Sequence, residues 1–256
     1  MEPETKINYG YKPDIIKVGE DFIFGGFTKV PELNLQPNSD WSSWLPQKEL
    51  QNLHGVETFA CVTFTILNCI EILIRRQYGE EKNYAERFLA SVSGTKVGGN
   101  TPQTVCEFLR KIGVVPEELW PFSPEVTSFE KYYENIPPKL YELAREFNNE
   151  WEFLHEFVPN STELIRQALK SSPLAVSVPA WYERNGKYYR PDGVADNHLT
   201  TLIKENTVFD SYDSIIKELE PISHQSIKRF YIRKKLSTPT LTLWQKLKYN
   251  VRNIFK

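Results

Sequence analysis

Apolar residues recur at helical spacing through the first half of the chain. In CVTFTILNCIEILI, Val62, Ile66, Ile70 and Leu73 follow one another at steps of three or four, which is the spacing of one helix face. Further apolar residues between them widen the stripe, so this helix is predicted to be buried over most of its circumference. Weaker patterns of the same period predict helices over residues 83–91, 101–112, 138–156 and 161–170.

The pattern changes in the second half to short runs rich in Val, Ile, Thr, Phe and Tyr. Turn residues bound these runs, as is typical of β-strands, and Asn185-Gly186 predicts a hairpin. The predicted fold class is therefore α+β, with a helical N-terminal subdomain and an antiparallel β-rich C-terminal subdomain. A site is expected in the cleft between the two. The runs cover residues 173–180, 198–205, 206–213 and 227–235.

Length and pattern together predict one sizeable domain with an extension at each end. The chain has 256 residues, of which 40% are hydrophobic, and this suits a single large core. Residues 47–235 hold the helical and β-rich patterns. Residues 1–46 are turn-rich with little helix signal, and residues 236–256 are predicted to form a linker and a basic amphipathic helix.

The C-terminal helix is the part of the chain most clearly suited to a partner. It runs from Leu241 to Lys256 and combines an apolar face, including Trp244 and Leu247, with basic residues. We expect it to dock on the acidic body of its own chain, on a protein partner, or on an anionic membrane surface. Nucleic acid is not expected, because the excess of basic residues is confined to this tail.

Cysteine usage and hydropathy indicate a reducing compartment. The chain has three cysteines, an odd and sparse set that argues against a disulfide framework. The polar start MEPETKINYGYKPD is unlike a signal peptide, and no apolar run approaches the ~20 residues of a membrane span. Because there is no CxxC spacing and no phosphate-binding motif, neither a metal nor a cofactor is expected.

Candidate chemistry centres on Cys61, which stands where the first strong helix begins. A helix N-terminus favours a thiolate and lowers its pKa, although an isolated cysteine more often simply packs a core. His198 opens a β-rich run, and Asp210 follows the apolar residues of the next run. Neighbouring strands would bring these two together, which gives the nucleophile, base and orienting group of a thiol hydrolase. His54, seven residues before Cys61, is a competing partner.

Seven segments along residues 47–235 resemble, in order, those of the papain-like cysteine peptidases. CVTF resembles the nucleophile segment at the start of that family's central helix, and VGGN resembles its Gly-Gly loop. DGVADNHLTTLI and TVFDSYD resemble the segments that carry the family's catalytic His and its Asn partner. EELWPF, SSPLAVSVPA and RFYIRKK match further segments. The chain thus resembles a divergent family member that lacks the secretory disulfides.

The resemblance implies a role for each matching residue. Cys61 would be the nucleophile, His198 the base and later the acid, and Asp210, which stands where the family has Asn, would orient the imidazole. Four further residues would line the substrate-binding region, with Tyr212 in place of the family's Trp; they are Gly98, Gly99, Asn197 and Tyr212.

The oxyanion hole departs from the family pattern. Gly55 stands six residues before Cys61, where the family places its oxyanion-hole Gln. Gln51 and Gln47 lie nearby, and a longer loop would fold one of them back. Glu57 is a poor substitute because a carboxylate repels a developing oxyanion. No inhibitory propeptide is recognisable in residues 1–46, which lack a long helix.

These observations favour a cysteine peptidase that cleaves peptide or amide bonds through a Cys61-His198-Asp210 triad and a thioester. One alternative is a catalytically weak or inactive domain of the same fold, serving as an adaptor attached through its C-terminal helix. Another keeps the chemistry and changes the substrate to an amide in peptidoglycan or an isopeptide bond. The expected partner of the domain itself is a peptide or protein substrate.

Overall fold

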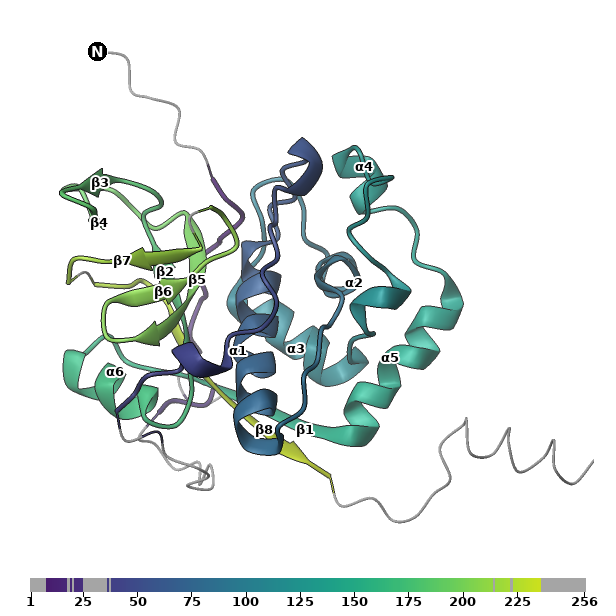
Figure 1. Cartoon of the computed structure of the whole chain (residues 1–256), viewed down its shortest axis with the longest axis horizontal. Helices are drawn as coiled ribbons and strands as arrows, with labels where there is room; N and C mark the ends of the chain where they lie inside the picture. The colour runs from purple at the N-terminus through teal and green to yellow at the C-terminus, as the bar shows by residue number, and fades with distance from the viewer. Residues whose placement is uncertain are drawn as a thin grey trace, which may run out of the picture.

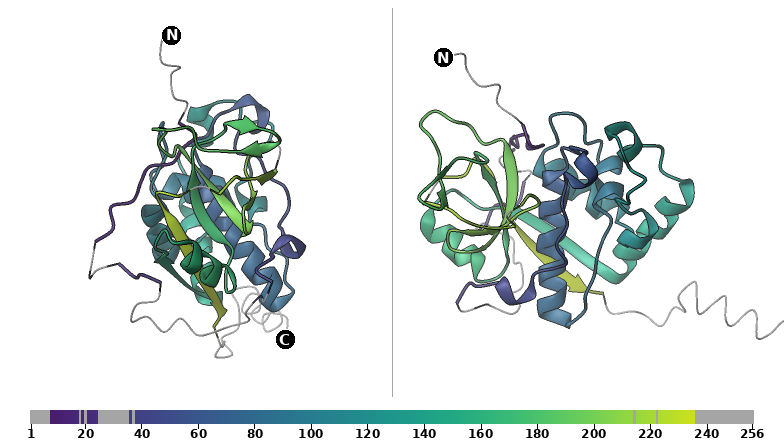
Figure 2. Two further views of the ribbon diagram at one scale, coloured as in Figure 1. Left: turned by 90° about the vertical axis from the view of Figure 1, so that its left-hand side faces the viewer. Right: turned by 45° about the horizontal axis from the view of Figure 1, so that its top comes forward.

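The computed structural model describes residues 8–17, 19, 21–24, 36, 38–213, 215–221 and 223–235. The predicted C-terminal helix, residues 241–256, lies outside the described residues. Two halves stand side by side, a helical half and a β-rich half (Figure 1). Helix α1 (Cys61–Tyr78) stands between the sheet and most of the other helices, whereas α6 (Thr162–Leu169) lies with the β-rich half (Figure 1 and Figure 2). The predicted α+β class is therefore confirmed.

Helix α1 is central because it is apolar on nearly every side. Every side chain from Cys61 to Ile74 is buried, so its strong apolar pattern follows from contact with both halves at once. It begins after Ala60 and ends at Gly79, whose left-handed φ of 66° suits a helix C-terminus. The other helices are α2 (Glu86–Val92), α3 (Pro102–Ile112), α4 (Phe129–Tyr132), α5 (Pro138–Glu150) and α6 (Thr162–Leu169). Short 3-10 turns are η1 (Ser42–Trp44), η2 (Leu53–Gly55) and η3 (Glu117–Leu119).

The β-rich half is a six-stranded antiparallel sheet in the order β1-β8-β2-β5-β6-β7. Strand β2 is central and buried along its whole length, whereas β7 alternates between exposed and buried residues at one edge. A separate two-stranded hairpin joins β3 and β4. The strands are β1 (Trp151–Phe157), β2 (Leu174–Val178), β3 (Glu183–Arg184), β4 (Lys187–Tyr188), β5 (His198–Lys204), β6 (Thr207–Phe209), β7 (Ile216–Glu218) and β8 (Ile227–Lys234).

Local sequence patterns predicted most elements, with one clear error. The turn at Asn185-Gly186 forms the β3–β4 hairpin, and both residues have positive φ, as this turn requires. The helix predicted over 138–156 is wrong in its last part, because it ends at Glu150 and β1 begins at Trp151. Residues 151–157 pair in register with β8. This long-range pairing overrides the local helical preference.

No helix in the described part of the chain is both long enough and apolar enough to cross a membrane.

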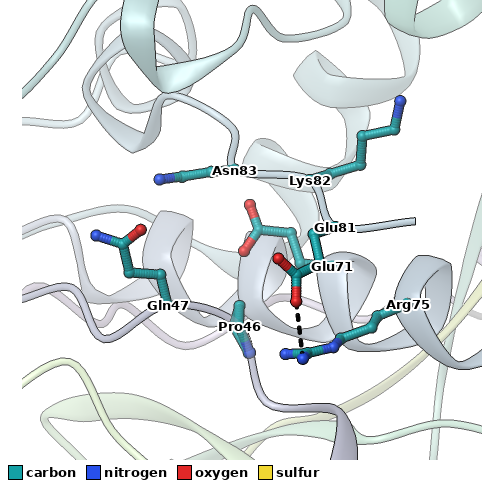
Figure 3. Close-up of a pocket in the computed structure, with 7 residues that line it drawn as sticks. All are labelled: Pro46, Gln47, Glu71, Arg75, Glu81, Lys82 and Asn83. Carbon is teal, nitrogen blue, oxygen red and sulfur yellow. Dashed lines mark ion pairs between the residues drawn. The ribbon is translucent and has the colours of Figure 1, made fainter. Parts of the chain in front are cut away.

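Two glutamates of the helical half, Glu71 and Glu86, are buried and Glu117 is partly buried, and this predicts a pH-dependent stability. Glu71 lines a cavity of about 300 Å³ (Figure 3). Burial raises the pKa of Glu71 and Glu86 well above the usual range, and it raises the pKa of Glu117 to about 8. Each carboxyl group therefore binds its proton more tightly in the folded chain than in the unfolded chain.

We expect the free energy of unfolding to fall between about pH 5 and pH 8. A raised carboxyl pKa stabilises the fold below the unfolded value of about 4.3, and this contribution is lost as pH rises through the folded value. The slope is up to ~1.4 kcal/mol per pH unit for each group. Urea unfolding across this range should show a flatter slope for Glu117→Gln, whereas the exposed control Glu118→Gln should match the parent chain. An unchanged slope for Glu117→Gln would contradict this account.

Candidate active site

Cys61 and His198 each begin an element at the junction of the two halves. Cys61 is the first residue of α1, and His198 is the first residue of β5. The Thr65 hydroxyl, one turn further along α1, donates to the carbonyl of Leu199 at 2.9 Å, so the start of the helix lies against the start of the strand. Both Cys61 and His198 are 0% exposed.

Asp210 reaches His198 because β5 and β6 are antiparallel neighbours. It directly follows β6, so it lies at the same end of the sheet as the first residue of β5. His198 Nε2 is 2.6 Å from Asp210 Oδ1. Burial alone would raise the pKa of Asp210, but His198 and Lys217 outweigh it and hold the pKa below its usual value. A carboxylate in this position accepts a hydrogen bond from Nε2–H, so it favours the tautomer of His198 with the proton on Nε2.

The other ring nitrogen of His198 remains available. Within the described part of the chain, the buried Nδ1 atom has no hydrogen-bond partner. Three aromatic rings pack edge-on around the imidazole, with centroid distances of 5.8 Å to Tyr9, 5.4 Å to Trp181 and 5.4 Å to Tyr212. These rings fix the orientation of the imidazole and exclude water from it.

Lys217 is a member of this cluster that sequence reasoning missed. Its Nζ atom lies 2.8 Å from Asp210 Oδ2 and 2.9 Å from the carbonyl of Tyr212. The side chain is almost fully buried and lies over the ring of Trp181. It is the one inward-facing residue of β7, between exposed Ile216 and exposed Glu218. In β7, exposed and buried residues alternate, and Lys217 stands at the buried position. A lysine at such a position is the sequence feature that could have predicted its place in the cluster.

Replacing Lys217 with methionine is expected to cost about 3–5 kcal/mol of unfolding free energy, because removing one partner leaves a buried charge without full compensation. Urea denaturation of the two chains measures this difference. The matched control is Lys48→Met, which removes an ion pair between exposed side chains, Lys48 and Asp213, and should change stability by less than about 1 kcal/mol. If both variants lose the same unfolding free energy, Lys217 contributes no more to stability than an exposed lysine does.

Burial disfavours the thiolate form of Cys61 in this structure. Burial raises its pKa far above the usual range, and the nearby carboxylates of Asp210 and Glu57 raise it further. Hydrogen bonds with the backbone of Leu199 and Val62 oppose this rise without cancelling it. The expected lowering of the thiol pKa by the helix N-terminus is therefore wrong for this covered state, since desolvation outweighs the helix dipole.

Gln51 is folded back into the same cluster. Its amide nitrogen lies 2.7 Å from the Tyr212 hydroxyl, 3.0 Å from Glu57 Oε1 and 3.0 Å from the carbonyl of Tyr9. Its amide oxygen accepts from Ser211 Oγ at 2.8 Å, which fixes the orientation of the group. The turn η2 makes this possible, because His54 and Gly55 adopt left-handed φ angles of 55° and 74° and tighten the loop.

The other candidates, Gln47 and His54, lie elsewhere, as do the two remaining histidines of the chain. Gln47 lines the cavity that also contains Glu71 (Figure 3), and Glu71 is ten residues, or about 15 Å, along α1 from Cys61. His54 is exposed, with its ring edge-on to Phe122. His155, on β1, contacts Glu107 of α3, and His224 lies 2.6 Å from the carbonyl of Ser177.

Glu57 and Tyr212 link Gln51 to the catalytic candidates. The Tyr212 hydroxyl donates a short hydrogen bond to Glu57 Oε2, and the backbone N–H of Phe59 donates to Glu57 Oε1 at 2.9 Å. The Glu57 carboxylate is thus already bonded by Gln51, Tyr212 and the backbone. Sequence reasoning singled out Tyr212 but did not foresee that its hydroxyl would bind Gln51.

The predicted substrate-binding residues lie beside the N-terminal segment, residues 8–14. The carbonyl of Asn197 accepts from the N–H of Tyr9 at 3.0 Å. Asn100, which was not among the predicted residues but directly follows Gly98 and Gly99, donates its N–H to the carbonyl of Gly10 at 3.0 Å. Gly98 accepts a longer bond of 3.4 Å from Asn8 Nδ2. The backbone of Gly10 lies so close to Gly99 that a Cβ atom on Gly99 would meet it at 1.6 Å.

Comparison with known proteins supports the fold and leaves the sequence family open. No family model matches the chain, and no curated protein matches it. Solved structures do match, and those below are cysteine proteases.

Xylellain, a cysteine protease from Xylella fastidiosa, aligns with a TM-score of 0.64 and 17% identity over 93% of this chain and 99% of its own. Bromelain from Ananas comosus, in complex with the E64 inhibitor, aligns with a TM-score of 0.55 and 17% identity over 77% of this chain and 98% of its own. The ragweed pollen cysteine protease Amb a 11, in its proform, aligns with a TM-score of 0.53 and 14% identity over 84% of this chain and 69% of its own. The chain therefore has the fold of the papain-like cysteine proteases, as the sequence resemblance implied.

Proposed function

We propose that the protein is a cysteine peptidase that hydrolyses peptide or amide bonds through Cys61, His198 and Asp210. The observation that carries this proposal is the state of His198. Asp210 binds its Nε2 atom at 2.6 Å, and its buried Nδ1 atom has no partner among the described residues. A neutral imidazole held in this tautomer has a lone pair on Nδ1 with which to accept the thiol proton.

In the proposed reaction the proton of the Cys61 thiol passes to His198 Nδ1. The thiolate attacks the carbonyl carbon of the substrate, and the carbonyl oxygen becomes an oxyanion. Gln51 Nε2 and the backbone N–H of Cys61 are the proposed donors to that oxyanion. The C–N bond then breaks, and the leaving amine takes the proton from Nδ1. Water attacks the resulting thioester and releases the acid and the free thiol.

Asp210 and Lys217 have distinct parts in this scheme. Asp210 keeps the imidazole in the required tautomer and stabilises the imidazolium that forms. Lys217 neutralises the second oxygen of the same carboxylate. The Asp210 carboxylate therefore offers His198 an oriented hydrogen-bond acceptor, and Lys217 balances the negative charge of that carboxylate.

The test is hydrolysis of an unfolded fluorescent protein such as labelled casein, under reducing conditions. We expect hydrolysis by the whole chain and its loss in step with alkylation of Cys61 by iodoacetamide. Hydrolysis that persists after complete alkylation of Cys61 would contradict the proposed nucleophile. No hydrolysis, with Cys61 shown to be accessible, would favour the adaptor interpretation.

A further inference from the structure

Asp210 and Lys217 come from one hairpin of the β-rich half. Asp210 directly follows β6, and Lys217 is the middle residue of β7, the next strand along the chain. The two strands pair antiparallel, with Lys217 opposite Val208, and the backbone N–H of Asp210 donates to the carbonyl of Ile215 at 2.7 Å. The same hairpin therefore holds both charged groups in place, with 2.8 Å between Asp210 Oδ2 and Lys217 Nζ.

The ammonium group of Lys217 is enclosed by the protein. Its side chain is 1% exposed, and that of Asp210 is 0% exposed. Besides Asp210, Lys217 Nζ lies 2.9 Å from the carbonyl of Tyr212, and the ring centroids of Trp181 and Tyr188 are 4.8 Å and 5.9 Å away. Because water screens charges weakly in such a place, the positive charge of Lys217 acts strongly on the groups around it.

The titratable and charged groups around the imidazole of His198 come from both halves. They are Asp210 and Lys217 on the β-rich half, Tyr212 after β6, Tyr9 on the N-terminal segment, and Cys61 and Glu57 on the helical half. The Glu57 carboxylate is bonded by Gln51, by the Tyr212 hydroxyl and by the backbone, whereas the Asp210 carboxylate binds the imidazole itself at 2.6 Å. The charge that Lys217 balances is therefore the one in direct contact with His198.

An aspartate and an asparagine orient an imidazole in the same way but differ in charge. Each accepts a hydrogen bond from Nε2–H through a side-chain oxygen. A lone aspartate also holds a proton on the imidazole and disfavours a thiolate at Cys61, because a nearby charge favours its opposite and disfavours its like. Asp210 together with Lys217 carries no net charge, so the pair can orient His198 as an asparagine would. The chain in fact departs from the family that it resembles by having Asp210 in place of asparagine.

We propose that Lys217 is a positioning residue of the active site, and that it makes Asp210 act on His198 as a neutral hydrogen-bond acceptor would. This inference rests on the proposed function, since it gives Lys217 a part in that reaction. Its consequence is that each charge lowers activity when the other is absent. Without Lys217, the carboxylate keeps the imidazole protonated and unable to accept the thiol proton. Without the charge of Asp210, the buried ammonium opposes the imidazolium that forms during the reaction.

The first test is a double-mutant cycle on the whole chain, with kcat/KM for a short fluorogenic peptide measured against pH. Lys217→Met should move the acid limb of the profile to higher pH, and Asp210→Asn should move it to lower pH, each by about one to three units. The chain with both changes should return toward the parent profile. It should also be at least ~10-fold more active than Asp210→Asn alone, as expected for two residues in contact. Additive effects of the two changes would overturn the proposal.

Lys228→Met is the matched control for the loss of a buried lysine. Lys228 is 0% exposed, and its ammonium lies 2.6 Å from Gln103 Oε1, outside the candidate site. This variant should lower stability and leave the acid limb at the parent pH, so a shift as large as that of Lys217→Met would count against the proposal. If near-UV circular dichroism shows that one single variant has not folded, the other single variant and the double variant decide. The double variant is expected to fold because it leaves no lone buried charge.

Titration of the imidazole itself tests the inference without turnover. In chains that also carry Cys61→Ser, NMR spectra of the four histidines follow the protonation of His198, whose signals are identified by their loss in His198→Ala. The midpoint of this titration should rise in Lys217→Met, fall in Asp210→Asn and return toward the parent value in the double variant. If these shifts occur while no chain cleaves the peptide, the charge balance stands and the peptidase proposal fails. If the midpoint is the same in all four chains, the charge balance fails, even where the parent chain is an active peptidase.

Discussion

Hydrolysis of labelled casein is expected to fall by at least ~10³-fold in Cys61→Ser and in His198→Ala, because each change removes a group without which the other cannot act. The double variant should lose little more than either single variant, since a nucleophile and its base work as one unit. Initial rates under reducing conditions, compared with the parent chain, measure these effects.

Two control variants test whether the loss of hydrolysis is specific to Cys61 and His198. Cys106→Ser changes another fully buried thiol, and His54→Ala changes the histidine nearest to Cys61 in sequence, which is exposed. Both should hydrolyse casein at rates within about threefold of the parent, a factor that corresponds to under 1 kcal/mol. A large loss in His54→Ala with normal activity in His198→Ala would show that the wrong histidine has been assigned.

Replacing Gln51 with alanine is expected to lower the rate by ~10²–10³-fold, which is the usual cost of losing one oxyanion donor. Gln51 is the glutamine whose amide nitrogen reaches the carbonyl of Tyr9. The control is Gln47→Ala, a glutamine four residues away that lines a different cavity and should leave the rate unchanged. Steady-state kinetics on a short fluorogenic peptide separates the effect on kcat from the effect on KM.

The outcome that would contradict this assignment is an equal effect of the two glutamine variants. Because Gln51 is fully buried, thermal unfolding of each variant must accompany the kinetics. A loss of activity that tracks only the loss of folded protein would place Gln51 among the structural residues.

The order and type of most elements could be predicted because local patterns determine them. The stripe from Cys61 to Ile74 predicted α1, and Asn185-Gly186 predicted the β3–β4 hairpin. The helix predicted over 138–156 failed where pairing between β1 and β8 decides the structure. That pairing joins residues some eighty positions apart, and no local pattern records it.

The residues of the candidate site likewise fall into two groups, those that the sequence predicted and those that it did not. Cys61, His198 and Asp210 were predicted from their positions at element ends and from resemblance, and the structure places His198 beside Asp210. Lys217 and the hydroxyl of Tyr212 were missed because their roles depend on contacts between loops and an edge strand. The binding of residues 8–14 was missed for the same reason, since contacts such as that between Gly10 and Asn100 join distant parts of the chain.

The measurement that tests the central claim most directly is active-site labelling with an epoxysuccinyl inhibitor, followed by mass mapping. The reagent is irreversible, so even brief exposure of Cys61, which is buried in this structure, allows labelling to reach completion. The account predicts one label per chain, on Cys61 alone, with hydrolysis of casein falling in proportion to the labelled fraction. Label on Cys69 or Cys106 instead, or full activity with Cys61 completely labelled, would contradict it.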